Sequence, residues 1–211
     1  MKKTLIIGAS GQIGKKFTQL MLDDGNHVVA LVRDKNKLSA ISNENLTIVE
    51  ADLTKDFGTA FKQCSNVVFV AGSGGNTGAD KTMLIDLWAA CRAADYAKAN
   101  AVEHFILVSS IGADAPSEGP ESMQPYLIAK HMADEHLMRS GLHYSIVRPG
   151  TLTNDDAKGE FTITRPAQKE DAIITRDDVA KALLFIVNNS PKSNKVTELF
   201  NGSNSIDEVM K

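Results

Sequence analysis

Short apolar segments alternate with longer amphipathic segments along most of the chain. The apolar runs are rich in Val, Ile, Leu and Phe and span residues 4–9, 27–32, 46–51, 66–72, 104–110 and 144–150. They lack polar alternation, which is typical of parallel strands covered on both faces. Helices are predicted between and after them at residues 12–24, 35–41, 55–63, 80–99, 125–140 and 177–188.

This order predicts one α/β domain with a doubly wound, mostly parallel sheet and helices on both of its faces. After residue 150 the pattern loosens, with two short β-like pieces at residues 160–164 and 172–175 and no obvious crossover helix between residues 150 and 175. A long irregular connection is often a binding loop, and ordinary surface is an equally good interpretation.

Composition narrows the class of protein. The 211 residues are 43% hydrophobic and carry a formal net charge of −3, so no basic field indicates nucleic acid or a membrane surface. Gly8 and Ser10 interrupt the first apolar run too early for a signal peptide, so a cytoplasmic protein is expected. Cys64 and Cys91 provide neither a disulfide framework nor a metal site.

The first apolar run leads directly into the glycine-rich sequence GASGQIG at residues 8–14. Gly8 permits a tight turn, Gly11 lets a pyrophosphate approach the backbone, and Gly14 allows the helix to pack closely on the strand. The helix N-terminus supplies free N–H groups and a positive potential. At the first strand-to-helix junction, this spacing indicates a dinucleotide site.

The end of the second apolar run indicates which dinucleotide binds. An NAD site usually has an acidic residue there for the ribose 2′-hydroxyl, whereas this chain has Val32 followed by Arg33. A guanidinium can hold a 2′-phosphate through two N–H bonds, and the Ser10 hydroxyl could assist. Asp34 could contact a ribose, but its place before KNKL better suits a helix cap. NADP(H) is therefore favoured over NAD(H).

Two further strand ends supply candidate cofactor contacts. Asp52 could accept a bond from the adenine amino group while Leu53 lies against the ring, and a helix-starting role for Asp52 is an equal alternative. The fourth run ends in AGSGG, where the small residues Ala71, Gly72 and Ser73 would let the backbone pass beside a cofactor. A merely flexible loop would have the same composition.

With the sequences FILVSS, YLIAK and IVRPG added to these features, the chain resembles the atypical branch of the short-chain dehydrogenase/reductases. The NmrA-like and NAD(P)-binding sugar-epimerase-like proteins are the most similar members. The resemblance runs from residue 3 to about residue 203 and implies a single-domain Rossmann fold for residues 1–211. The cofactor half is expected at about residues 1–110, with the catalytic helix and substrate loops at about residues 111–175.

The family pattern gives catalytic roles to Ser110, Tyr126 and Lys130, with Ser109 as the alternative serine. A free tyrosine holds its proton too tightly to act as a base at neutral pH, and a nearby ammonium favours the phenolate. Lys130 lies one helical turn beyond Tyr126 and could do this while reaching the nicotinamide ribose. Ser110 would orient the substrate oxygen.

The resemblance also adds cofactor contacts near the nicotinamide. The complete set of predicted cofactor-binding residues is Gly8, Ser10, Gly11, Gln12, Ile13, Gly14, Arg33, Asp52, Leu53, Ala71, Gly72, Ser73, Val108, Lys130, Pro149, Gly150, Thr151 and Leu152. No metal is expected.

The implied function is an NADP(H)-dependent oxidoreductase or epimerase that acts on a small carbonyl or hydroxyl substrate. Two alternatives are a non-catalytic NADP(H)-binding redox sensor and a flavin or quinone reductase that needs no proton from Tyr126. The expected partner is a small molecule, and the chain is expected to be a monomer or homodimer. The apolar residues Met83, Leu84, Leu87 and Trp88 are predicted to form the packing face of the helix at residues 80–99.

Overall fold

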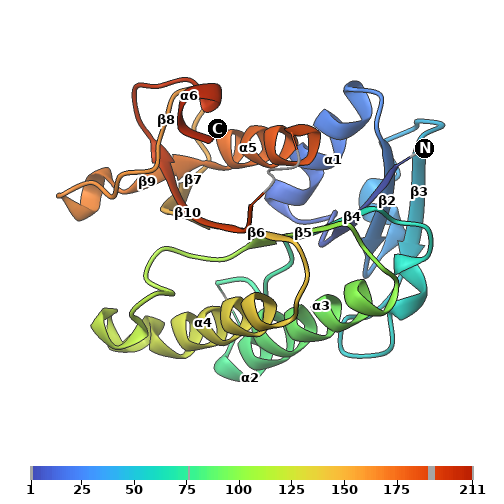
Figure 1. Cartoon of the computed structure of the whole chain (residues 1–211), viewed down its shortest axis with the longest axis horizontal. Coiled ribbons are helices and arrows are strands. Elements are labelled where there is room, and N and C mark those ends of the chain that lie inside the picture. The colour runs from blue at the N-terminus through green and yellow to red at the C-terminus, as the bar shows by residue number, and fades with distance from the viewer. Residues whose placement is uncertain (1, 76, 190–192, 211) are drawn as a thin grey trace.

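The computed structural model describes residues 2–75, 77–189 and 193–210 and contains, within them, a sheet of eight strands. The strand order is β3-β2-β1-β4-β5-β6-β10-β8 (Figure 1). All neighbours are parallel except β8, which runs antiparallel to β10. The strands are β1 (Lys3–Ile7), β2 (His27–Val32), β3 (Leu46–Glu50), β4 (Asn66–Phe69), β5 (His104–Val108), β6 (Tyr144–Pro149), β8 (Phe161–Thr162) and β10 (Lys195–Asn201). The predicted fold is confirmed.

Helices cover both faces of this sheet (Figure 1). On one face lie α1 (Gln12–Asp23) and α5 (Arg176–Asn189), and on the other lie α3 (Ala90–Ala99) and α4 (Gln124–Arg139). Successive strand residues point to opposite faces, so Ile6 packs in the first core while Leu5 and Ile7 pack in the second. Burial on both faces explains why these strands are continuous apolar runs.

Two of the predicted helices are reduced to single 3₁₀ turns. Residues 35–41 form only η1 (Lys35–Leu38), and residues 55–63 form only η2 (Gly58–Phe61). In η1 the only buried side chain is Leu38. A short helix without an apolar face gains too little from packing to offset the cost of nucleation. Other short turns are η4 (Pro116–Glu118), η5 (Glu121–Met123) and η6 (Lys169–Asp171).

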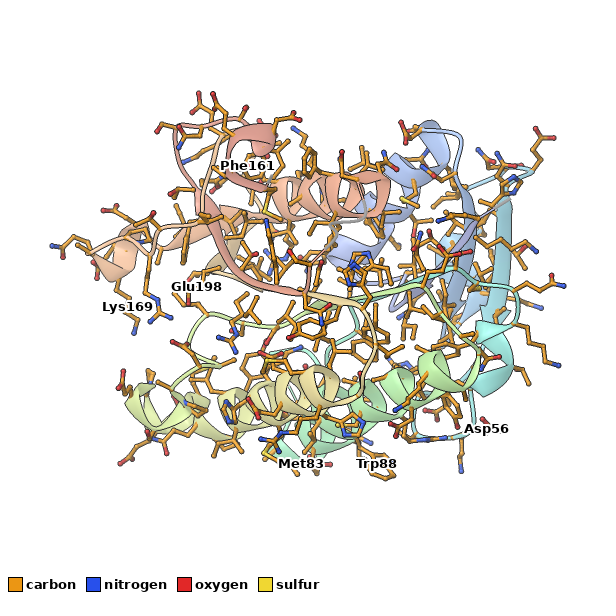
Figure 2. The ribbon with its side chains drawn as sticks, in the orientation of Figure 1. Asp56, Met83, Trp88, Phe161, Lys169 and Glu198 are labelled. Atoms are coloured by element: carbon orange, nitrogen blue, oxygen red, sulfur yellow. The ribbon has the colours of Figure 1, made fainter. Side chains whose placement is uncertain are left out.

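The helix predicted at residues 80–99 is present, but its middle is unusual. It is built from α2 (Ala79–Thr82), a π-helical segment η3 (Met83–Ala89) and α3. The predicted packing face is wrong for three of its four residues, because Met83 is 47% and Trp88 56% exposed, and Leu84 also faces outward. Leu87 is partly buried and packs against the second core, as predicted. Figure 2 shows Met83 and Trp88 on the side of this helical layer that faces away from the sheet. The π register turns Asp86 and Ala89 inward instead.

The segment after residue 150 contains more regular structure than expected. The two β-like pieces appear as β8 and β9 (Ile173–Thr175), and β9 pairs in parallel with β7 (Thr151–Thr153). The strand β10 and the short helix α6 (Ile206–Met210) were not predicted. Because β6 and β10 are parallel neighbours, the chain between them, including α5, is a crossover connection.

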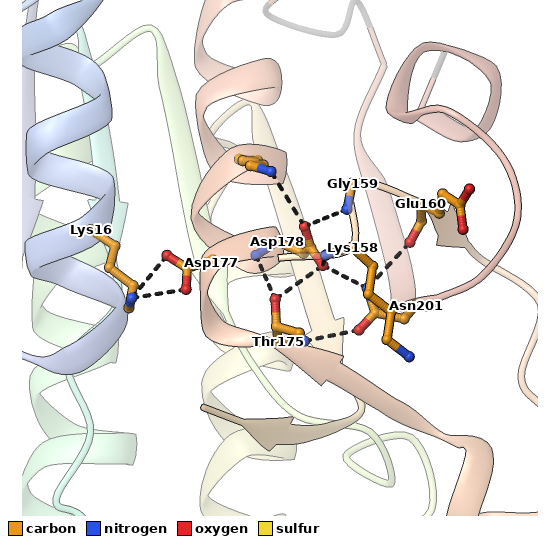
Figure 3. Close-up of polar contacts among 9 residues, drawn as sticks. Lys16, Lys158, Gly159, Glu160, Thr175, Asp177, Asp178 and Asn201 are labelled. Atoms are coloured by element: carbon orange, nitrogen blue, oxygen red, sulfur yellow. Dashed lines mark hydrogen bonds and ion pairs between the residues drawn. The ribbon is translucent and has the colours of Figure 1, made fainter. Parts of the chain in front are cut away.

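Buried Asp178 joins separate parts of this crossover through hydrogen bonds (Figure 3). Its carboxylate accepts bonds from the backbone N–H groups of Lys158 at 2.9 Å and Gly159 at 3.0 Å, and from Asn201 Nδ2 at 2.7 Å. The Asp178 backbone N–H donates to Thr175 Oγ1 at 3.0 Å, which caps α5. Burial opposes ionisation, but these bonds keep the pKa of Asp178 below its usual value. One carboxylate thus holds the 158–159 turn against β10.

Candidate functional site

The glycine turn brings strand β1 and helix α1 close together. Gly8 has a φ of +92°, and a Cβ added there would lie 2.6 Å from the Ala71 backbone nitrogen. A Cβ on Gly14 would lie 2.2 Å from the Gly8 carbonyl oxygen. Both positions therefore require glycine, the first for its φ and for space, the second for space alone. The turn is fixed by backbone packing.

The N-terminus of α1 is open to an anion. Its N-cap, Gly11, makes no side-chain capping bond, and the first turn contains no acidic residue. The first amides of a helix have no intrahelical partner and carry the positive end of its dipole. Gly11 and Gln12 are both exposed. This uncapped end, at a turn that glycines leave without side chains, fits the pyrophosphate of a dinucleotide.

The strand ends predicted to meet the adenosine lie beside this turn. Arg33 directly follows β2 and is exposed. Asp34 is the cap of η1, since its side chain accepts from Asn36 N at 3.0 Å. Asp52 accepts from both Thr54 N and Thr54 Oγ1 at 2.9 Å, and these bonds lower its pKa. Asp52 thus shapes the turn after β3, and its contact with adenine stays a prediction.

The loop after β4 is hydrogen-bonded to the π-helical segment η3. Ser73 N donates to Asp86 Oδ2 at 3.0 Å, and the hydroxyls of Ser73 and Thr82 lie 3.3 Å apart. A Cβ on Gly72 would lie 3.2 Å from Asp86 Oδ1, so the backbone runs directly against this carboxylate. The predicted alternative of a merely flexible loop does not describe Gly72 and Ser73.

Tyr126 and Lys130 lie together on α4, as the four-residue spacing requires. The Lys130 ammonium nitrogen is 5.7 Å from the centroid of the Tyr126 ring. Lys130 is only 3% exposed; it donates to the Val108 carbonyl at 3.1 Å and pairs with Asp86 at 3.3 Å. Burial alone would lower the pKa of Lys130, but the Tyr126 and Asp86 oxygens hold it above its usual value. The ammonium therefore stays charged beside the phenol ring.

The two serines after β5 face different surroundings. Ser109 is buried and donates to Asp134 Oδ2 at 2.9 Å, while Ser110 is half-buried and donates to the carbonyl of Ile111 at 3.1 Å. Arg148 also binds Asp134 Oδ2, through Nε at 3.0 Å. Burial raises the pKa of Asp134, and the bonds from Ser109 and Arg148 partly oppose this. Ser109 belongs to a buried network, whereas Ser110 remains the better-placed candidate.

The segment predicted to pass the nicotinamide begins with the last residue of β6 and continues into β7. Pro149 accepts from Ile111 N at 3.0 Å, which ties β6 to the chain just after Ser110. A Cβ on Gly150 would lie 2.3 Å from the Ala172 carbonyl oxygen. Thr151 and Leu152 then form β7. These residues lie at the same sheet edge as Ser110, because parallel strands end together.

Two buried carboxylates at the site were not predicted from the sequence. Asp86 lies within the apolar sequence MLIDLWA, and Asp134 follows Lys130 by four residues on α4. An acid inside an apolar stretch, or one helical turn from a buried lysine, would have been the signal. Both sequences otherwise have the pattern of an ordinary helix.

Other features lie apart from this edge. Surface grooves of about 350 Å³ and 300 Å³ lie beside β10 and between α1 and α5, and no predicted site residue lines either. Among the described residues, no three His, Cys, Asp or Glu side chains are grouped to hold a metal. None of the described helices is long and apolar enough to cross a membrane.

Known proteins share both the sequence and the fold. A family model described as NAD(P)H-binding matches residues 8–190. The chain is 36% identical to the uncharacterized sugar epimerase YhfK of Bacillus subtilis over 99% of both chains. A Bacillus halodurans structure described as an NAD-dependent epimerase/dehydratase has a TM-score of 0.92 and 38% identity, covering 99% of this chain and 98% of that one. The oxidoreductase ylbE of Lactococcus lactis has a TM-score of 0.86 and 26% identity, covering 99% and 94%.

Proposed function

The chain belongs to the NAD(P)H-binding family, and we propose that it is an NADP(H)-dependent oxidoreductase or epimerase acting on a small carbonyl or hydroxyl compound. The uncapped N-terminus of α1 behind the Gly8 turn carries this proposal. The descriptions of its relatives as epimerases and an oxidoreductase support it.

The residues at the carboxyl edge of the sheet would have separate roles in cofactor binding and proton transfer. Gly8, Gly11 and the α1 amides would hold the pyrophosphate, with the loop after β4 beside it. A bound nicotinamide would accept or supply a hydride. Tyr126 would move a proton at the substrate oxygen, and Lys130 would favour the phenolate form of Tyr126. Ser110 would orient the same oxygen by a hydrogen bond.

Replacing Tyr126 by phenylalanine tests the catalytic part. A positioned general acid or base contributes about 10²-fold or more to the rate, so kcat of Tyr126→Phe should fall by at least that much across a panel of carbonyl substrates. Its affinity for NADPH should stay close to that of the wild type. Tyr144→Phe is the matched control, because Tyr144 begins β6 at the opposite end of the strand. Normal turnover by Tyr126→Phe would sink the proton-transfer role.

The preference for NADP(H) rests on Arg33 and is tested by binding. Two charge-assisted bonds to a 2′-phosphate are worth roughly 3 kcal/mol or more. Wild-type protein should therefore bind NADPH roughly 100-fold more tightly than NADH. Arg33→Gln should remove that preference, and Lys35→Gln, two residues further along, should retain it. Equal binding of both cofactors by the wild type would contradict this assignment.

A second candidate is a redox sensor that binds NADP(H) without turnover. The observation that favours it is the pairing of Lys130 with Asp86, since the carboxylate offsets much of the charge that would act on Tyr126. Such a protein would bind NADPH, yet leave its absorbance unchanged with carbonyl, quinone and flavin substrates. Turnover of flavins or quinones that survives Tyr126→Phe would indicate a reductase.

The proposal extends to the partner and the location. A small molecule is the expected substrate, and a monomer or homodimer is the expected state. We also propose a cytoplasmic location, as expected for a chain whose two cysteines, Cys64 and Cys91, are free thiols.

A further inference from the structure

Asp86 touches two parts of the predicted cofactor site at once. It lies in the π-helical segment η3 and is 1% exposed. One carboxylate oxygen accepts the Ser73 backbone N–H at 3.0 Å, and the other lies 3.3 Å from the Lys130 ammonium. The side chain of Asp86 therefore links the loop after β4 to Lys130.

Burying the Asp86–Lys130 ion pair is costly, so the position of these two side chains has to be well defined. Taking two ions out of water costs several kcal/mol each, and a buried pair offsets this only with good geometry and further hydrogen bonds. Lys130 finds such a bond at the Val108 carbonyl, 3.1 Å away, at the end of β5. Asp86 and Lys130 therefore connect three elements, the β4 loop, η3 and α4, to the end of β5.

The π-helical segment is what points Asp86 at this junction. A π turn widens the helix and changes which side chains face inward, and such turns are frequent at functional sites. Across η3 the large apolar residues Met83 and Trp88 face solvent, while Asp86 and Ala89 are buried. An aspartate inside and a tryptophan outside reverses the usual burial preference.

We propose that Asp86 is a positioning residue that couples the backbone of the cofactor loop at Ser73 to the position of the Lys130 ammonium. The inference rests on the proposed NADP(H) site. Replacing Lys130 should then alter the hydrogen bond of the Ser73 amide, even though Ser73 and Lys130 are not bonded to each other.

Hydrogen exchange at the Ser73 amide tests the coupling in cofactor-free protein. Asp86→Ala removes the acceptor and should speed exchange by roughly tenfold or more. Lys130→Met should also speed exchange, because a buried carboxylate without its ion-pair partner is costly and turns towards water, away from the Ser73 amide. Combining Lys130→Met with Asp86→Ala should add almost nothing, since Asp86 carries the effect.

Cofactor binding provides the second readout. Asp86→Asn keeps the side-chain volume and an acceptor for Ser73, so it serves if Asp86→Ala does not fold. Both variants should bind NADPH roughly tenfold more weakly, as expected for a coupling of 1–2 kcal/mol. Leu137→Ala is the matched control, because Leu137 is buried on α4 and packs within the second core. It should lower Tm without changing NADPH affinity.

Three results would overturn the proposal. Exchange at Ser73 could be unchanged in Lys130→Met, the effects of the two substitutions could simply add, or NADPH affinity in the Asp86 variants could match Leu137→Ala. A wild-type protein that binds no NADPH would reject the proposed function alone, because the exchange experiment needs no cofactor and still decides whether Asp86 couples its two partners.

Discussion

The two halves of the carboxyl edge of the sheet are built by different means. Around β1 and β4 the shape comes from missing side chains, since Gly8 and Gly14 leave room for backbone to meet backbone. Around β5 and β6 the shape comes from buried charged side chains, with Lys130, Asp134 and Arg148 almost fully enclosed. The first half has its shape set by the backbone, whereas the second half has its properties set by the charges of its side chains.

This difference predicts which substitutions each half of the edge tolerates. Close backbone packing is intolerant of added volume but indifferent to pH, because it contains no titrating groups. Buried charges tolerate volume changes better, yet each depends on a partner, so removal of one partner is costly. The two halves should therefore respond to different substitutions.

The largest effect is expected in the charged half. Arg148→Met leaves Asp134 buried without its ion-pair partner, which should lower the free energy of unfolding by about 4 kcal/mol. The double variant Asp134→Leu with Arg148→Met removes both charges and should recover most of this loss. Urea unfolding of the three proteins measures the effect. A double variant no more stable than Arg148→Met would show that the charge pair is not the cause.

A slightly smaller effect is expected in the glycine half. Gly8→Ala combines a positive φ with a Cβ 2.6 Å from Ala71 N, and should cost about 3 kcal/mol. Gly25 has a φ of +77° but no atom within 4 Å of an added Cβ, so Gly25→Ala should cost only about 1 kcal/mol. Thermal unfolding compares the pair. Equal losses would mean that conformation alone, without the contact at Ala71, sets the cost.

The smallest effect is a pH dependence, and it sharpens the contrast. His104 begins β5, bonds Ser145 Oγ at 2.9 Å and stacks on His143. Burial, then the charge of His143, lowers the pKa of His104 from 6.5 to about 4. The folded state thus binds fewer protons than the unfolded state between these values, so stability falls as the pH drops below 6.5.

The expected loss between pH 7.5 and 5 is about 2 kcal/mol from this one side chain. His104→Gln should flatten the acid limb of the stability curve measured by urea unfolding. His136→Gln should change it little, since the ion pair of His136 with Asp95 is at the surface, where such pairs contribute little to stability. An unaltered acid limb in His104→Gln would assign the pH dependence to other groups.

Patterns with local causes were predicted correctly. The six apolar runs became β1 to β6, and the caps and periodicity placed α1, α4 and α5 within a residue or two. The strand β10, between β6 and the edge strand β8, was not predicted, because its sequence KVTELFN mixes exposed and buried positions. Only pairing with β6 makes it a strand, and that partner lies about fifty residues away in the chain.

Within the site, the sequence by itself determined the glycine turn and the Tyr126–Lys130 spacing, because both follow from backbone geometry over a few residues. Only the tertiary structure decided that Lys130 pairs with Asp86 and that Ser109, not Ser110, joins Asp134. These contacts join different elements, and their strength depends on burial, which no short stretch of sequence specifies. The charge next to Lys130 on α4 therefore comes from a carboxylate on another helix.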